Sequence, residues 1–98
     1  MAVPTPQTKT ITFAIYGPIA RADLPGLCDR VCALFAHHRP DVAFCESGSV
    51  PADAVTIDAL ARLQLAARRS GCQVRLRGAS RELCDLIAFL GLDAVLPE

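Results

Sequence analysis

The chain has 98 residues, a length that suits one small domain with a single core. Apolar residues make up 52% of it, so the composition favours a packed core over disorder. Ten basic and ten acidic side chains cancel, which leaves no strong field to hold nucleic acid or an anionic membrane. Aromatic residues are few, which also weakens any base-stacking function.

The pattern of apolar residues and cysteines predicts a cytoplasmic protein without a membrane span. No apolar run approaches the roughly 20 residues that a membrane-spanning helix needs. The first seven residues lack the basic segment followed by an apolar segment that marks an export signal. The five cysteines follow no repeating spacing, so we expect them to be reduced thiols that pack as small hydrophobic side chains.

The first forty residues predict a tail, a strand and a helix. Residues 1–9 hold two prolines and polar residues, which indicates a flexible N-terminal tail before one domain spanning residues 10–98. Apolar and small polar residues alternate over residues 10–16, as in a half-buried strand. A helix should begin at Asp23, which is a suitable N-cap, and end at Arg39 because Pro40 follows.

The rest of the chain repeats this alternation of strands and helices. The short apolar run at residues 42–45 is typical of a strand covered on both faces. The later elements are a loop at 46–51, a helix from Asp53 to Ser70, a strand at 72–77, a helix capped by Ser80, and a short strand or turn at 92–96. Strands that alternate with helices predict an α/β domain with a small mixed, mostly parallel sheet.

One group of side chains on the first predicted helix contains residue types that can bind a metal or act in catalysis. Cys28 and Cys32 lie one helical turn apart, with His37 and His38 beyond them, but they lack the paired spacing of zinc ligands. No nucleophile or carboxylate is tied to the two histidines by a motif. We therefore predict no metal site, no cofactor and no catalytic residue in this group.

The remaining cysteines leave a thiol-using enzyme open as a minor alternative. Cys28, Cys45 or Cys72 would serve as the nucleophile. Such a thiol would need a lowered pKa, which requires a nearby positive charge or a helix N-terminus. Rates of alkylation at neutral pH test this alternative.

Taken in order, five segments of the chain resemble the STAS domain, the module of sulfate transporters and anti-sigma-factor antagonists. The segments are Gly17-Pro18-Ile19, Cys45-Glu46-Ser47-Gly48, and residues 55–69, 74–80 and 90–96. The resemblance covers about residues 10–96 and implies a mixed sheet backed on one side by helices, without enzymatic activity. The family also begins with a two-stranded hairpin, whereas one convincing strand precedes Asp23 here.

The resemblance also places the family's regulatory site at the start of the second helix. Antagonists of anti-sigma factors carry an Asp-Ser-Ser-Gly-Leu motif there, and a partner kinase phosphorylates its second serine. The Asp of the motif aligns with Asp53, and the phosphoacceptor position falls on Val55, which has no hydroxyl group. Thr56 could substitute as the phosphoacceptor if the loop shifts by one residue.

The function that this resemblance implies is a protein-interaction module of bacterial transcription or stress signalling. Its partner would be an anti-sigma factor or a related kinase-like protein. The expected docking surface runs from Glu46 to Asp58, and its contact residues are Val50, Pro51, Asp53, Val55, Thr56 and Asp58. The alternative is a STAS sensor domain that binds a nucleotide or lipid in the same loop region, which a thermal-shift screen would detect.

Overall fold

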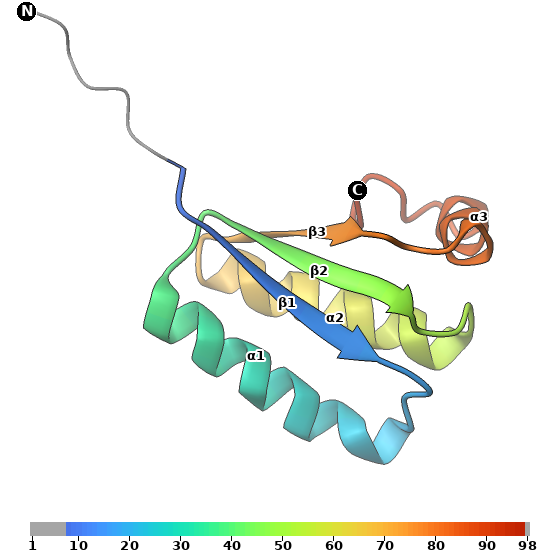
Figure 1. Cartoon of the computed structure of the whole chain (residues 1–98), viewed down its shortest axis with the longest axis horizontal. Coiled ribbons are helices and arrows are strands. Elements are labelled where there is room, and N and C mark those ends of the chain that lie inside the picture. The colour runs from blue at the N-terminus through green and yellow to red at the C-terminus, as the bar shows by residue number, and fades with distance from the viewer. Residues whose placement is uncertain (1–7, 98) are drawn as a thin grey trace, which may run out of the picture.

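Three parallel strands and three α-helices alternate along the chain, as Figure 1 shows for this computed structural model. The structure describes residues 8–97, so most of the expected N-terminal tail lies outside the described residues. The elements are β1 (Thr10–Tyr16), a 3-10 turn η1 (Arg21–Asp23), α1 (Leu24–His38), β2 (Val42–Ser49), α2 (Ala54–Arg69), β3 (Gln73–Arg77) and α3 (Arg81–Phe89).

The sheet has the order β1-β2-β3, and both strand pairings are parallel. The helices α1 and α2 lie side by side along one face of it, while α3 lies beyond the end of β3 (Figure 1). This arrangement confirms the predicted α/β fold class. All pairings between the described strands are parallel because each connection is a helical crossover.

The middle strand differs from its prediction in length and in exposure. β2 continues to Ser49, four residues past the expected end, because Glu46 pairs with both neighbouring strands and Ser49 pairs with Tyr16 of β1 beyond an irregularity in the register. Its residues alternate between buried and half-buried, so the expectation of a strand covered on both faces is wrong. Ala43, Cys45 and Ser47 face the helices, whereas Phe44 and Glu46 lie on the open face of the sheet.

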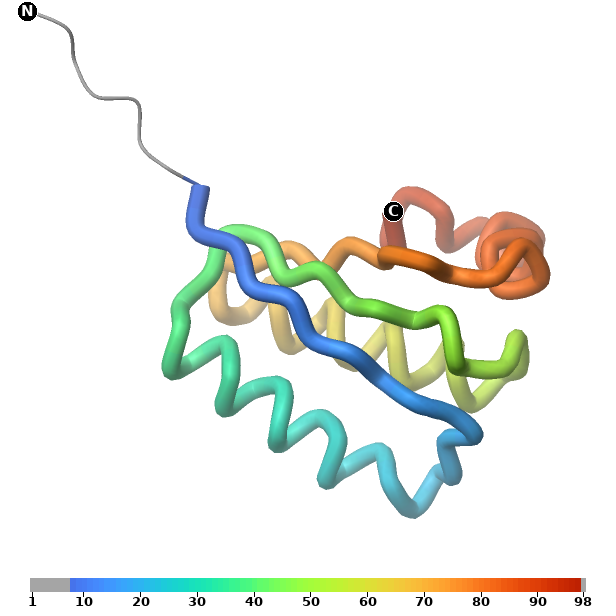
Figure 2. The backbone as a smooth tube through the Cα atoms, in the orientation of Figure 1, coloured from blue at the N-terminus to red at the C-terminus, as the bar shows by residue number. Residues whose placement is uncertain are grey.

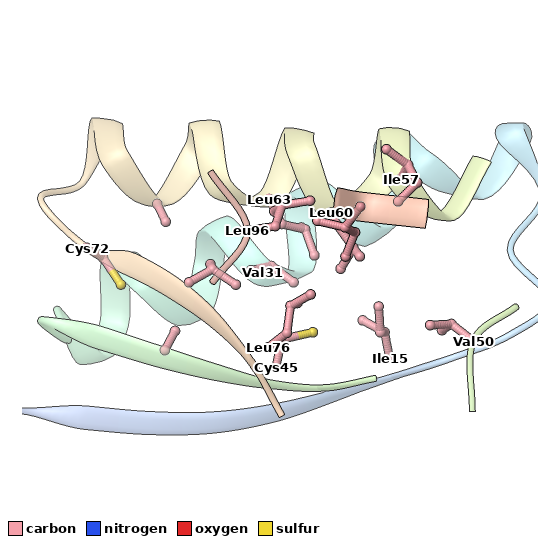
Figure 3. Packing of buried hydrophobic residues seen from close by; sticks show 14 of the residues in the cluster. Ile15, Val31, Cys45, Val50, Ile57, Leu60, Leu63, Cys72, Leu76 and Leu96 are labelled. Atoms are coloured by element: carbon pink, nitrogen blue, oxygen red, sulfur yellow. The ribbon is translucent and has the colours of Figure 1, made fainter. Parts of the chain in front are cut away.

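The hydrophobic core lies between the sheet and the two helices beneath it, and Figure 3 shows its packing. Each fully buried large apolar side chain contributes about 1.5–3 kcal/mol relative to an exposed one. Apolar side chains with at most 2% exposure come from the sheet and from all three helices: Leu24, Phe35, Ala43, Cys45, Ala59, Leu60, Leu63, Ala67, Val74, Leu76 and Leu83. The strands and α1 bury the residues that their apolar pattern predicts. For α2 the pattern predicts Ile57, Leu60, Ala61 and Leu65 as the inward residues, and only part of this is right. Ile57 and Leu60 are buried, whereas Leu65 is 53% exposed and Leu63 and Ala67 are buried instead.

The helix ends follow the expected local signals, with one exception. α1 ends at Arg39, whose left-handed backbone (φ 46°) closes the helix just before Pro40. The Ser80 hydroxyl accepts the Leu83 backbone N–H at 3.1 Å, which confirms it as the cap of α3. Asp23 precedes α1, but its carboxylate accepts the N–H of Ala20 at 3.2 Å and caps no amide of the helix.

The outer edge of β3 is closed by groups from outside the sheet. The side-chain amide of Gln64, on α2, donates to the Val74 carbonyl at 2.8 Å and accepts the Val74 N–H at 2.8 Å. The same amide donates to the Val95 carbonyl at 2.6 Å. Further along, the Leu76 N–H donates to the Pro97 carbonyl at 2.7 Å, where the C-terminal segment returns to β3 (Figure 2).

This return of the chain decides between the two alternatives for residues 92–96. They form a turn and not a strand, and the turn delivers the Val95 and Pro97 carbonyls to α2 and β3. Among residues 8–97, no helix is both long enough and apolar enough to cross a membrane.

Candidate docking surface at the start of α2

The loops that follow β1 and β2 meet at the carboxyl edge of the sheet, next to the start of α2. Parallel α/β sheets commonly bind ligands and partners at this edge. Gly17 fits the contact because it has no side chain: a Cβ there would lie 2.5 Å from Cδ of Pro51 and 3.0 Å from Cα of Val50. The two loops therefore support each other and fix the position of the helix start.

Asp53 caps α2 and remains exposed to solvent. Its carboxylate accepts the backbone N–H of Thr56 at 2.8 Å, which satisfies one of the free amides of the first turn. This hydrogen bond is the main cause that lowers the pKa of Asp53, and the hydroxyl of Thr56 adds to it. The carboxylate therefore stays ionised to a lower pH than a free aspartate and places a negative charge at the positive end of the helix.

Val55, the residue aligned with the family's phosphoacceptor, is partly exposed in the first turn of α2. Its two neighbours in the chain differ sharply: Ala54 is exposed and Thr56 is fully buried. The side chain of Val55 is therefore not withdrawn into the core. At this position the helix start offers an apolar surface.

Thr56 lies beneath the surface, with 0% of its area exposed. Its hydroxyl is close enough to Asp53 to affect the pKa of that carboxyl, yet it makes no hydrogen bond of ordinary geometry within the described part of the chain. A kinase could reach this hydroxyl only if the first turn of α2 opened. The structure therefore offers no support for Thr56 as a substitute phosphoacceptor.

Removing the buried Thr56 hydroxyl is expected to leave stability unchanged or raise it. Thr56→Val keeps the shape of the side chain and deletes a polar atom that is buried without a good partner. We expect the free energy of unfolding to rise by 0 to about 1 kcal/mol in urea denaturation. Thr56→Ala is the control, because it also removes the buried methyl group and should lower stability. A loss of more than about 1 kcal/mol in Thr56→Val would show that the hydroxyl has a structural partner.

Asp58 is held by two arginines on the outer side of α2. Its carboxylate accepts the Nε–H of Arg62 at 2.9 Å and an Nη1–H of Arg21 at 3.1 Å. The pairing with Arg62, four residues along the helix, confirms the sequence prediction. The hydrogen bond from Arg62 is the main cause that lowers the pKa of Asp58. No sequence pattern indicates the pairing with Arg21, which lies 37 residues away on η1.

Two residues expected at the docking surface lie elsewhere: one is buried beneath it, and the other is on the open face of the sheet. Val50 is 5% exposed, and in Figure 3 its side chain points toward Ile15, so it supports the loop and does not offer contact area. Glu46 lies in β2, where it faces Arg77 on the open side of the sheet at 3.8 Å. The accessible part of the surface is therefore formed by Pro51, Asp53, Val55 and Asp58.

The cysteine and histidine group on α1 lies away from this surface. Cys28 is half-buried and Cys32 is exposed, while the rings of His37 and His38 contact each other edge to face with centroids 4.7 Å apart. Within residues 8–97, no three His, Cys, Asp or Glu side chains gather into a group that could hold a metal ion.

Burial raises the pKa of the three thiols considered as nucleophiles, whereas activation of a thiol requires a lowered pKa. It raises the pKa of Cys45 to about 12, with a smaller contribution from the charge of Glu46. Burial is also the main cause that raises the pKa of Cys28 and of Cys72. A nucleophilic thiol needs a lowered pKa, so these three positions do not fit that role.

The native protein is expected to protect Cys45 from alkylation. At pH 8 a thiol with a pKa near 12 has about a thousandfold less thiolate than one with an ordinary pKa, and Cys45 is also fully buried. We expect iodoacetamide to modify the exposed Cys32 first and to leave Cys45 unmodified, as measured by peptide mass spectrometry. The same reaction in urea should modify both. Equal rates in the native protein would contradict the burial of Cys45.

Neither comparison with known sequences finds a match for this chain. None of the models of known protein families matches it, and no curated protein does.

Proposed function

We propose that this chain is a non-enzymatic STAS-type interaction module that binds an anti-sigma factor or a related kinase-like protein in bacterial signalling. We further propose that it acts in the cytoplasm, where such partners are found. The observation that carries the proposal is the partly exposed Val55 in the first turn of α2, next to the exposed cap Asp53. This is where the resemblance to the family places the partner's target residue.

The geometry of the helix start supports a docking role. Pro51 and Val55 offer apolar contact area, and the carboxylates of Asp53 and Asp58 can orient a partner by accepting hydrogen bonds. The Asp58 carboxylate is already paired with two arginines, so the net charge around it is not negative. A partner therefore meets a surface of mixed character with a small apolar centre.

A valine at the phosphoacceptor position changes how the module is regulated. Phosphorylation of a serine adds nearly two negative charges, and the free amides of a helix N-terminus tolerate them well. The added charge would therefore act on the partner's surface and leave the fold of the module intact. A chain with valine at this position cannot accept the group there, so its docking surface should stay in the state that corresponds to an unphosphorylated antagonist.

Affinity capture tests the proposal. The full chain, immobilised as bait in a lysate of its source organism, should retain a kinase-like anti-sigma protein that mass spectrometry identifies. The matched control bait is Val55→Asp, which should fold normally because an acidic residue suits the first turn of a helix. Capture of such a partner by the native chain and not by the variant would support the proposal. Equal capture by both baits would rule out this surface, and capture of no kinase-like protein would count against the function itself.

A further inference from the structure

The two edges of the sheet differ in whether their outer backbone groups have hydrogen-bond partners among the described residues. At β3, the Gln64 amide occupies the outer N–H and C=O of Val74, and the Pro97 carbonyl occupies the N–H of Leu76. At β1, the described residues supply a sheet partner on one side only, which is β2. Proteins normally guard such an edge with charges, prolines or a covering segment, because it can pair with another strand. β1 has no charge and no proline in its seven residues.

A hollow of about 550 Å³ lies along this open edge, between β1 and the start of α1. Three consecutive strand residues, Ala14, Ile15 and Tyr16, line it. Because side chains alternate between the two faces of a strand, consecutive residues can share one hollow only where it runs along the backbone edge. Ile19 and Leu27 give part of the hollow an apolar wall, and the charged side chains of Asp23 and Arg30 also line it.

From the open edge and this hollow we infer that the chain forms a two-fold homodimer in which β1 pairs antiparallel with β1 of a second copy. The inference does not rest on the proposed function, because it concerns the outer edge of β1 and not the start of α2. β1 carries no charge, so a strand without charged residues can pair along it without burying an unpaired charge. Among the described strands only β1 has this character, because β2 contains Glu46 and β3 contains two arginines.

The alternation of β1 restricts the register of this pairing. Ile11, Phe13 and Ile15 face the helices, whereas Thr12 and Ala14 lie on the open face. A two-fold axis must keep each face opposite itself, so it passes through a residue and not between two residues. With Phe13 on the axis, Ile11 of one copy lies opposite Ile15 of the other.

This register covers the part of the hollow next to Ile15 and opposes no like charges within the strand. The side chain of Ile11 from the second copy would lie over the hollow that Ile15 and Leu27 line. On the open face, Thr12 lies opposite Ala14 of the second copy, so no charged pair is formed within the strand. The two three-stranded sheets would join into one continuous sheet of six strands.

Two matched double variants test the pairing, because both change the same exposed positions. Thr12→Lys with Ala14→Lys places like charges opposite each other twice in the dimer. Thr12→Glu with Ala14→Lys places opposite charges there instead. Both side chains are exposed in the single chain, so both variants should keep the native circular dichroism. From typical cross-strand pair energies, the dissociation constant of the first should exceed that of the second by about tenfold or more.

Sedimentation equilibrium of the full chain and both variants measures this difference. Over protein concentrations from low micromolar to about 200 μM, the wild type should change from mostly monomer to mostly dimer, which corresponds to an interaction of modest strength. Hydrogen exchange of the wild type provides a readout without variants, because protection of the β1 amides should rise with protein concentration. A wild type that stays monomeric over this range would overturn the inference. Equal dimerisation of the two variants would also overturn it, because the interface would then lie away from β1. So would β1 amides that are protected equally at every concentration, because a segment of the same chain would then cover the edge.

Discussion

Replacing Gln64 with leucine is expected to lower the free energy of unfolding by about 3 kcal/mol. The substitution places an apolar side chain of similar size in a site that is 1% exposed. It removes the only side-chain partner of the Val74 N–H and C=O and one partner of the Val95 carbonyl among the described residues. Buried backbone groups that lose their partners cost about 1–3 kcal/mol each, and the added apolar contact offsets part of this. Urea denaturation monitored by circular dichroism measures the change.

A substitution at Gln73 is the matched control for this prediction. Gln73 is exposed at the start of β3, so Gln73→Leu should change the free energy of unfolding by less than about 0.5 kcal/mol. A loss of similar size in the two variants would contradict the role of Gln64 as a clamp between α2, β3 and the C-terminal turn.

Gln64→Glu should give the same loss with a characteristic dependence on pH. A carboxylate at this position would face the Val74 and Val95 carbonyls, which both act as acceptors, in a buried site. Burial and these carbonyls raise the pKa of such a glutamate in the folded state above its unfolded value. The variant should therefore be closest to wild type below about pH 4, where the carboxyl is protonated in both states, and lose stability as the pH rises through the folded pKa. A pH-independent difference from wild type would contradict this account.

Placing a negative charge at Val55 is expected to weaken binding to the partner by about tenfold or more. Val55 lies at the apolar centre of the proposed surface, where a charge must be desolvated on binding and has no partner prepared for it. Val55→Asp should leave the melting temperature nearly unchanged, because the side chain is partly exposed and an acid suits the first turn of α2. Titration calorimetry with the captured partner measures the affinity.

Val55→Thr is the control for charge. It changes the side chain to a similar shape without adding a charge, so it should bind within about threefold of the wild type, a difference of less than 1 kcal/mol. If the threonine and aspartate variants lost affinity equally, the contact would depend on the shape of the valine side chain and not on the neutrality of the surface.

Local signals predicted most of the fold. The alternation of residues 10–16, the stripe of α1, the cap at Ser80 and the stop at Ser70 each act over a few residues, and the structure follows them. The bounds of α2 were also predicted, but its inward face was only partly right, because Leu65 is exposed and Leu63 is buried. The errors arose where distant segments decide the outcome. β2 extends to Ser49 because its neighbours provide hydrogen-bond partners, although its last residues have the small polar character of a loop.

The position of the candidate site in the sequence was predictable, but which of its side chains are exposed was not. The spacing to Asp53 located the helix start, and the ion pair between Asp58 and Arg62 followed from helical geometry. The burial of Thr56 and Val50 depends on how the loop folds over the core, which no local pattern encodes. The approach of Arg21 to Asp58 likewise brings together η1 and α2, which lie far apart in the sequence.

The most direct test of a docking surface that cannot be switched is to incubate the chain with its captured kinase-like partner and Mg-ATP, then measure both its intact mass and its affinity. We expect the native chain to gain no phosphate group and to bind as tightly as before, whereas Val55→Ser should gain one phosphate group and release the partner. Stoichiometric phosphorylation of the native chain between residues 46 and 58, with loss of binding, would contradict the account.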